Sequence, residues 1–420
     1  MLKQIYLDHA ATTYVDERVA KKMLPFFTKE FGNPSSLYAL GRRANLAVSV
    51  ARKDVAVILG CNPLEIIFTG GGTESDNLAI LGAARANKSF GNHIVTLKIE
   101  HHAVLYACGQ LEKEGFVVTY LPVDEFGLVT PEKIIAAIKP ETILVTIMYA
   151  NNEIGTIEPI AEIGRAIKKY NEIHRKGKSP VLFHTDACQA AGTLDLDVNR
   201  LHVDFLTLNA SKIYGPKGVG VLYKKKGFKI QPLVFGGGQE FGLRSGTENV
   251  AGIVGLSEAL KLAQDNKEKE NKRLTDLRDY LWKGLSKKIS KLKLNGHPLK
   301  RLPNNLNLSI LDIEGEAMLL YLDEIGVQAA TGSACNSESL EPSYVLLAIG
   351  LPYEFAHGSL RFTLGHCNTK AEMDFLIKNL PPIVEKLREM SPVRLNLKEE
   401  KTRKHPEYKR ACCVIVPNKK

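Results

Sequence analysis

Short, almost entirely apolar segments alternate with amphipathic helical patterns through the first half of the chain, and this alternation restricts the fold most. A strand that is apolar on both faces must be covered on both sides, as in parallel sheets flanked by helices. Strands are expected at residues 66–68, 93–98, 116–121, 142–149, 181–184, 203–208 and 218–223. Helical spacing marks 43–59, 74–86, 103–114, 131–138 and 160–174. The pattern predicts an α/β fold with a mostly parallel sheet.

The second half of the chain predicts a smaller α+β domain. A helical pattern without internal proline covers 249–289 and is expected to link the two domains. The patterns of the small domain are strands at 305–310 and 359–364 and helices at 314–324 and 370–390. We therefore expect a large cofactor-binding domain at 15–260, a small domain formed by 1–14 and 261–392, and a basic tail at 393–420.

The composition is that of an ordinary globular protein, with 44% hydrophobic and 24% charged residues among 420. The net charge of +10 permits an acidic partner, but solvated basic faces explain it more simply, so nucleic acid is not expected as a direct partner. No apolar run approaches the roughly 20 residues that a membrane span needs. Seven irregularly spaced cysteines without a CxxC pair oppose a disulfide framework and a structural zinc site. A cytoplasmic location is expected, because free thiols persist there.

Polar clusters follow several of the predicted strands, at the sheet edge where α/β proteins bind ligands. The loop Thr69-Gly70-Gly71-Gly72-Thr73 opens a helix, so its backbone N–H groups could cradle a phosphate. An ordinary glycine-rich turn capped by Thr73 explains the loop equally well when it is taken alone.

Four further residues indicate a particular ligand only when they are considered together. Asp186 could pair with a protonated ring nitrogen, and Gln189 could bond a phenolic oxygen. Lys212, before a Gly/Pro turn, could form a Schiff base, and His101 could stack on a ring. Each also has a structural explanation, as a helix cap, a surface lysine or a core histidine. Pyridoxal phosphate is the one ligand that needs a lysine, an acid and an anion cradle at once.

Cys335 lies in a run of small residues, Gly332-Ser333-Ala334-Cys335-Asn336-Ser337, before a helix expected at 342–349. Small neighbours in a loop leave the sulfur accessible, and a thiolate is both a nucleophile and a metal ligand. An inert free cysteine is the alternative.

With these motifs the chain resembles cysteine desulfurases of the NifS/IscS type, which are class V aminotransferase-like enzymes of the fold-type I pyridoxal-phosphate group. The resemblance covers about residues 5–392. The matching stretches are 6–13, 32–36, 73–80, 100–105, 151–155, 184–189, 212–218, 244–247, 332–335 and 361–365. It implies pyridoxal 5'-phosphate as cofactor, L-cysteine as substrate and a homodimer.

The resemblance also implies a role for each matching residue. Lys212 corresponds to the Schiff-base lysine and proton-transfer base, His101 to the stacking histidine, and Cys335 to the nucleophile that takes sulfur as a persulfide and leaves L-alanine. Cys335 is also a candidate iron–sulfur ligand shared with a scaffold partner. The implied cofactor contacts are Gly72, Thr73, Asn152, Asp186, Gln189, Asn209, Ser211, Lys212 and Thr247, the last reaching the other subunit. The implied substrate contacts are Asn33, Asn152 and Arg361.

The chain departs from the family pattern beside the lysine. Ser211 stands where a phosphate-binding histidine is usual, and Asn209 where serine is frequent, so phosphate binding by this strip is open. The expected function is cysteine desulfuration for iron–sulfur cluster assembly or tRNA thiolation, with a scaffold protein or a thiolation carrier as sulfur acceptor. The alternatives are a selenocysteine lyase or class V aminotransferase of the same fold, and a catalytically inactive sulfur-transfer scaffold.

Overall fold

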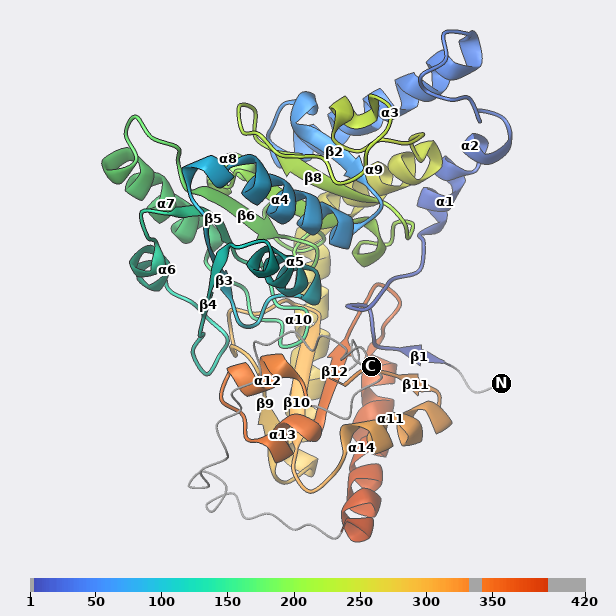
Figure 1. Cartoon of the computed structure of the whole chain (residues 1–420). Helices are drawn as coiled ribbons and strands as arrows, with labels where there is room; N and C mark the ends of the chain where they lie inside the picture. Colours follow the sequence, from blue (N-terminus) through green and yellow to red (C-terminus); the bar gives the residue numbers. More distant parts are fainter. Residues whose placement is uncertain (1–3, 332–341, 392–420) are drawn as a thin grey trace, which may run out of the picture.

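A seven-stranded sheet lies at the centre of the larger part of the molecule (Figure 1). The computed structural model describes residues 4–331 and 342–391. The spatial order of the strands is β2 (Ile66–Thr69), β8 (Gly220–Lys224), β7 (Phe205–Asn209), β6 (Leu182–Asp186), β5 (Thr142–Thr146), β3 (His93–Leu97) and β4 (Val117–Leu121). All neighbours are parallel except those of β8, which runs antiparallel to both β2 and β7. The prediction of a mostly parallel sheet is confirmed.

The reversed direction of β8 has a simple cause in chain length. Only residues 210–219 connect β7 to β8, whereas a parallel return needs a crossover of a dozen residues or more. The connection therefore turns back at once, at the same edge where β6 and β7 end. Lys212 lies in this connection, at the end of the 3-10 helix η3 (Ala210–Lys212).

Alternating residues of the strands pack against helices on opposite faces of the sheet, as the apolar strands predict. Ile67, Leu144 and Leu182 share one buried cluster with α4 (Gly72–Ala86) and α5 (His102–Lys113). Their neighbours Phe68 and Val145 belong to a second cluster, which includes residues of α3, α7 and α9. The helices outside the α4–α5 layer are α1 (Glu17–Met23), α2 (Pro25–Thr28), α3 (Ala39–Leu59), α6 (Pro131–Ala137), α7 (Ile160–His174), α8 (Val198–Leu201) and α9 (Val250–Asp265).

The smaller part has two sheets and its own core. The antiparallel order is β12 (Ser359–Thr363), β10 (Asn305–Ile310) and β9 (Leu292–Leu294), while β1 (Ile5–Tyr6) pairs in parallel with β11 (Val327–Gln328). The helices that contribute to this core are α10 (Lys267–Lys288), α11 (Gly315–Glu324) and α14 (Lys370–Met390). The N-terminal strand thus packs with the C-terminal half of the chain, as the expected composition of a small α+β domain requires.

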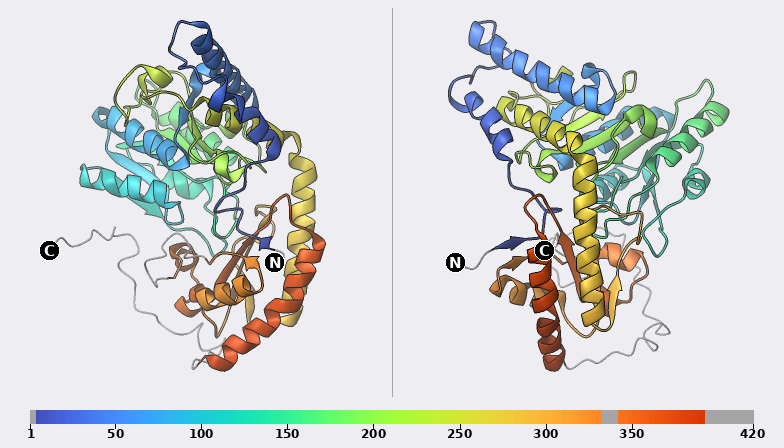
Figure 2. Two further views of the ribbon diagram at one scale, coloured as in Figure 1. Left: turned by 90° about the vertical axis from the view of Figure 1, so that its right-hand side faces the viewer. Right: turned by 180° about the vertical axis from the view of Figure 1, so that it is seen from behind.

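The predicted single helix over 249–289 is wrong in one respect, because the structure divides it into α9 and α10 at Asn266. The backbone of Asn266 leaves helical geometry (φ −103°, ψ 2°), and its side chain donates to the carbonyl of Leu262 at 2.9 Å. Ala263 still packs on the large core, whereas Leu274 belongs to the small one, so α10 passes from one part to the other (Figure 2). The proposed domain division at residue 260 stays a prediction.

The segment after residue 341 packs on the large part. It forms α12 (Tyr344–Ala348) and α13 (Tyr353–His357), whose buried Val345, Leu346 and Phe355 join the core of the large sheet. The helix expected at 342–349 is therefore observed in shortened form. Within the described ranges, no helix is both long and apolar enough to cross a membrane.

The small core should depend on Phe362, which is fully buried in β12. Phe362→Ala is expected to lower the free energy of unfolding by about 3–5 kcal/mol, since it removes a large side chain from a packed interior. Phe375→Ala, at a position that is 37% exposed, is the matched control and should lose clearly less. Urea denaturation followed by circular dichroism measures both; equal losses would contradict the burial of Phe362.

Candidate active site

The predicted cofactor residues lie at the carboxyl edge of the large sheet, after β6, the neighbouring β7, and β3, which β5 separates from β6. Asp186 ends β6, Lys212 follows β7, and His101 follows β3 as the N-cap of α5. Burial lowers the pKa of His101, the charge of Asp186 raises it and that of Lys212 lowers it, so the three side chains are close enough to interact. The Nδ1 atom of His101 accepts from the backbone N–H of Ala103 at 3.1 Å, which leaves the proton of the neutral ring on Nε2.

Asp186 belongs to a buried polar layer that contains a second carboxyl group. Its Oδ1 accepts from the N–H of Cys188 at 2.9 Å. Asp76, from α4, is 1% exposed, and burial together with the charge of Asp186 raises its pKa well above the usual range. Like charges in one buried site oppose joint ionisation, so the ionised form of Asp76 is disfavoured beside Asp186.

His184 completes this layer without adding charge. Its two ring nitrogens lie 2.8 Å from Oγ1 of Thr146 and 3.1 Å from Oγ1 of Thr207, and burial lowers its pKa to about 4. Neither Asp76 nor His184 is among the residues that the sequence predicts as part of the site. The signal for Asp76 was a carboxyl group in a helix whose neighbouring positions, such as Leu78 and Ala79, are apolar.

The turn that carries Lys212 is held by the N-terminal arm, the segment that begins with β1 and contains Ala10, Ala11 and Thr13. Thr13 donates from its N–H and its Oγ1 to the carbonyl of Ser211, at 2.8 and 3.0 Å, and accepts from the N–H of Tyr214 at 2.8 Å. Tyr214 has φ +63°, a conformation that non-glycine residues rarely adopt and that surrounding bonds must hold. The arm thus fixes the backbone on both sides of the lysine.

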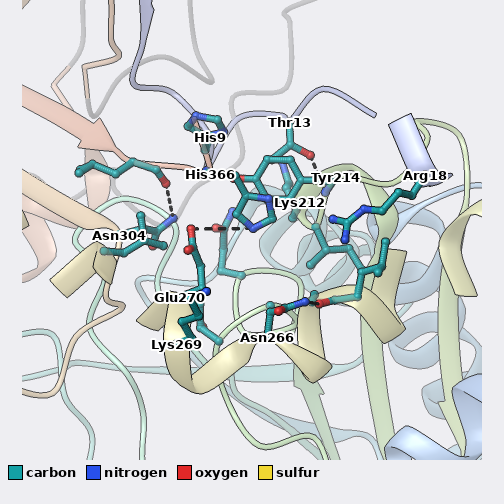
Figure 3. Close-up of a pocket in the computed structure, with 18 residues that line it drawn as sticks. His9, Thr13, Arg18, Lys212, Tyr214, Asn266, Lys269, Glu270, Asn304 and His366 are labelled. Atoms are coloured by element: carbon teal, nitrogen blue, oxygen red, sulfur yellow. Dashed lines mark hydrogen bonds and ion pairs between the residues drawn. The ribbon is translucent and has the colours of Figure 1, made fainter. Parts of the chain in front are cut away.

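The same arm contacts the side chains of the site. Nζ of Lys212 donates to the carbonyl of Ala11 at 2.5 Å, and Nε2 of Gln189 donates to that of Ala10 at 3.0 Å. Lys212 also lines a cavity of about 250 Å³ between the two parts of the chain, together with His9, Thr13 and Tyr214 (Figure 3). The lysine therefore has open space beside it, although its turn is rigid.

An open hollow of about 610 Å³ brings together the residues predicted to cradle a phosphate. Gly72 and Thr73 line it from the first turn of α4, Asn209 lines it from the end of β7, and Ser211 from the connection that follows. The N-terminus of a 15-residue helix offers unpaired N–H groups and a favourable dipole for an anion. The hydroxyl of Ser211 donates to Oδ1 of Asn209 at 3.2 Å, so both residues that depart from the family pattern lie at this hollow.

These observations fit pyridoxal phosphate. The anion cradle, the carboxyl group of Asp186, the ring of His101 and the amine of Lys212 occur along one sheet edge, and each supplies one group that the cofactor needs. No histidine is among the described residues that line the cradle, and the N-terminus of α4 lies at it.

Arg361 and Asn152 form the predicted substrate side. Arg361 is 4% exposed and donates to the carbonyl of Asn152 at 3.0 Å and to Oδ1 of Asp8 at 2.7 Å. Nε of Arg361 and Oδ1 of Asn152 are buried and have no hydrogen-bond partner among the described residues. Buried polar groups are rarely left unpaired, so this pair is suited to a polar ligand.

Two of the described residues that were predicted to form the site, Asn33 and Thr247, are not brought to this edge. Asn33 is exposed in the turn between α2 and α3, where its Oδ1 accepts from the N–H of Ser35, far from the small sheet (Figure 1). Thr247 is exposed before α9 and does not line the phosphate hollow of its own chain. Cys335 lies outside the described residues, and so does its predicted role as a metal ligand. The described part of the chain contains no cluster of three or more metal-ligating side chains.

Comparison with known proteins identifies related chains along nearly the whole length. Residues 5–376 match the family model described as Aminotransferase class-V. The chain is 54% identical over 406 residues to "Cysteine desulfurase IscS" of Clostridium botulinum, covering 96% of this chain and 100% of that protein. It is 53% identical over 391 residues to the protein of the same name from Methanosarcina thermophila, with coverage of 93% and 94%.

Two solved structures show the same architecture. One is titled "NIFS-LIKE PROTEIN", with a TM-score of 0.85, 37% identity and coverage of 92% of this chain and 100% of that one. The other is titled "SspA in complex with cysteine", with a TM-score of 0.74, 35% identity and coverage of 86% and 99%.

The packing at Gly72 leads to a test of the cradle. A Cβ atom there would lie 2.7 Å from Sγ of Cys188. Overpacking costs about 1–3 kcal/mol, so Gly72→Ala should weaken binding of pyridoxal phosphate roughly tenfold or more. Gly238→Ala is the control, because a Cβ atom there would meet no atom within 4 Å. Titration of cofactor-free protein by visible absorption measures both; equal affinities would exclude Gly72 from the cradle.

Proposed function

The chain belongs to the class-V aminotransferase family, and from that premise we propose that it is a pyridoxal-phosphate-dependent cysteine desulfurase. It converts L-cysteine to L-alanine and passes the sulfur to Cys335. The observation that carries the proposal is the convergence of His101, Asp186 and Lys212 beside an anion cradle, in a chain more than half identical to named cysteine desulfurases.

Pyridoxal phosphate, when bound, supplies an electron-accepting ring that weakens bonds at the substrate's α and β carbons. Asp186 would pair with the protonated ring nitrogen of the bound cofactor, and its neighbour Asp76 has a pKa raised by burial and by the charge of Asp186. Lys212 would hold the cofactor and move the Cα proton at its Nζ. His101 would stack on the ring, and its Nδ1 accepts from Ala103, which leaves the proton of the neutral ring on Nε2.

Arg361 orients the substrate carboxylate. A guanidinium group binds a carboxylate through two parallel hydrogen bonds, and Arg361 now uses one nitrogen on Asp8. Its Nε is buried and lacks a partner among the described residues, so the N–H at Nε is available to donate a hydrogen bond to the substrate carboxylate. Asn152, bound to Arg361 through its carbonyl, offers a free Oδ1 on the same side.

Cys335 completes the reaction. Its thiolate forms a bond to the sulfur of L-cysteine while the substrate C–S bond breaks, and the electron pair of that bond stays with the carbon skeleton. Protonation of the skeleton gives L-alanine, and Cys335 is left as a persulfide. Sulfur attack on sulfur needs a soft nucleophile, which a serine hydroxyl is not.

Cys335→Ser decides between the proposal and its rivals. The variant should keep the absorption of bound cofactor and lose sulfide release from L-cysteine with a reductant by several orders of magnitude. An aminotransferase would be unaffected by the change, and undiminished sulfide release from the variant would refute Cys335 as the residue that takes the sulfur. Lys212→Ala is the companion: a colourless wild-type protein, or one whose absorption does not depend on Lys212, would point to the inactive scaffold.

We propose a homodimer, because large apolar side chains are exposed along α2, α3 and the turn between them. They are Leu24, Phe27, Phe31, Leu37, Leu46, Val50 and Val57, all more than half exposed. Clustered exposed apolar groups mark interfaces. Asn33 lies in the same region, and a second subunit would explain why Asn33 and Thr247 do not reach the site of their own chain.

The dimer is tested by placing a charge at this surface. Leu37 is 88% exposed, and Leu37→Glu should shift the mass in sedimentation from twice 46.4 kDa toward 46.4 kDa, because an interface disfavours an unpaired charge. Leu299→Glu, at a position 86% exposed in the small part, is the matched control and should leave the mass unchanged. A wild-type monomer would contradict the dimer directly.

The sulfur acceptor is proposed from the relatives. Proteins named IscS at this identity favour iron–sulfur cluster assembly, with a scaffold protein as acceptor, and tRNA thiolation through a carrier is the second route. A cytoplasmic location is proposed because Cys61, Cys108, Cys188 and Cys367 are free thiols.

A further inference from the structure

The hollow at the first turn of α4 contains an acidic side chain where a phosphate is expected to bind. Among the described residues that line the hollow there is no lysine, arginine or histidine, and Glu74 is the one ionisable side chain. A carboxylate in the first turn of a helix is attracted by the same N–H groups and the same dipole that would attract a phosphate. The hollow would therefore repel a phosphate dianion unless the charge of Glu74 is compensated.

Glu74 is held at the hollow by two groups, one of which is a cation. Its Oε2 accepts from the N–H of Gly70 at 2.9 Å, and its Oε1 accepts from Nε of Arg244 at 2.9 Å. Nη2 of Arg244 lies 3.4 Å from Oε2, so the guanidinium group faces both oxygens of the carboxylate. Paired arginine and carboxylate groups of this kind form strong, charge-assisted hydrogen bonds. Arg244 therefore compensates the charge of Glu74 directly.

The ion pair lies against the glycine loop that precedes α4. A Cβ atom at Gly70 would lie 2.5 Å from Oε2 of Glu74 and 3.6 Å from Nη2 of Arg244. The absence of a side chain at Gly70 thus makes room for the pair beside the hollow. The side chains of Arg244 and Glu74 are 28% and 26% exposed, so solvent screens their charges only in part.

The backbone around Arg244 is fixed by its own contacts. Arg244 forms a parallel bridge with Val234, and the N–H of Ser245 donates to the carbonyl of Val234 at 3.4 Å. Ser245 is buried, and its Oγ donates to the carbonyl of Gly237 at 2.7 Å. The guanidinium group is therefore brought to α4 by a loop that is held in place independently of Glu74.

We propose that Arg244 is a positioning residue for the cofactor phosphate: by pairing with Glu74 it cancels the negative charge at the hollow and leaves the N–H groups of α4 to the phosphate. The inference rests on the proposed binding of pyridoxal phosphate. Arg244 acts through Glu74 and supplies positive charge to a cradle in which Ser211 stands where a histidine is usual.

Arg244→Gln in the full-length protein freed of cofactor tests the proposal. The change leaves the charge of Glu74 uncompensated, so the dissociation constant of pyridoxal phosphate should rise roughly tenfold. Pyridoxal lacks the phosphate, and its dissociation constant should stay within about twofold of wild type. Titration of the visible absorption of the Schiff base measures both constants. Adding Glu74→Gln to Arg244→Gln removes the repelling charge and should restore the affinity for pyridoxal phosphate.

Arg85→Gln is the matched control, because Arg85 makes the same kind of pair at the other end of α4. Its Nε and Nη2 donate to the two carboxylate oxygens of Glu114 at 2.9 and 2.6 Å, and its side chain is 31% exposed. This variant should bind both ligands like wild type. An equal rise in the dissociation constant of pyridoxal phosphate for Arg85→Gln and Arg244→Gln would overturn the proposal.

The remaining outcomes are also decisive. Unchanged binding of pyridoxal phosphate by Arg244→Gln would overturn the proposal, and so would a parallel loss of pyridoxal binding or a failure of Glu74→Gln to restore affinity. If Arg244→Gln does not fold, Glu74→Gln alone decides, because it should bind pyridoxal phosphate at least as tightly as wild type and weaker binding would contradict the proposed repulsion. A wild-type protein that binds no pyridoxal phosphate would instead refute the proposed function.

Discussion

The short return from β7 to β8 is the constraint on which the site depends. Ten residues cannot cross the sheet, so the chain reverses at the carboxyl edge and leaves Lys212 beside Asp186. Such a tight turn needs support, which Thr13 supplies from the N-terminal arm on both sides of the lysine. Because the arm also pairs with β11, the small part of the chain contributes directly to holding the lysine.

The sheet and most of its helices could be predicted from the sequence because their signals are local. In strands and amphipathic helices the apolar residues recur with a fixed period, which can be recognised from neighbouring residues alone. Gly60 at the end of α3 and Thr130 before α6 are local signals of the same kind. The break at Asn266 could not be predicted, because asparagine is tolerated in helices and only the passage from one core to the other requires a bend there.

The residues of the site also divide into those that a local sequence pattern predicts and those that it does not. Gly72, Asp186 and Lys212 follow strands, and strand ends meet at one edge of a parallel sheet, so their convergence follows from the topology. Asp76 lies beside Asp186 only because distant segments meet, as its 3.6 Å distance from Nε2 of His184 shows, and no local pattern encodes such a meeting. Asn33 and Thr247 lie away from the site of their own chain, and the homodimer proposed above would account for both.

The charge balance of the buried layer links the parts of the site. Burial raises the pKa of Asp76 and of the nearby Glu100 and lowers that of His184 to about 4, so these groups favour their neutral forms beside Asp186, which is proposed to meet the ring nitrogen. A carboxylate paired with a ring cation avoids the cost of an isolated buried charge. At the other end of the proposed cofactor site, the α4 terminus and Ser211 line the hollow in which the phosphate would bind. The sheet edge is thus matched in charge to a ligand that is cationic at its ring and anionic at its phosphate.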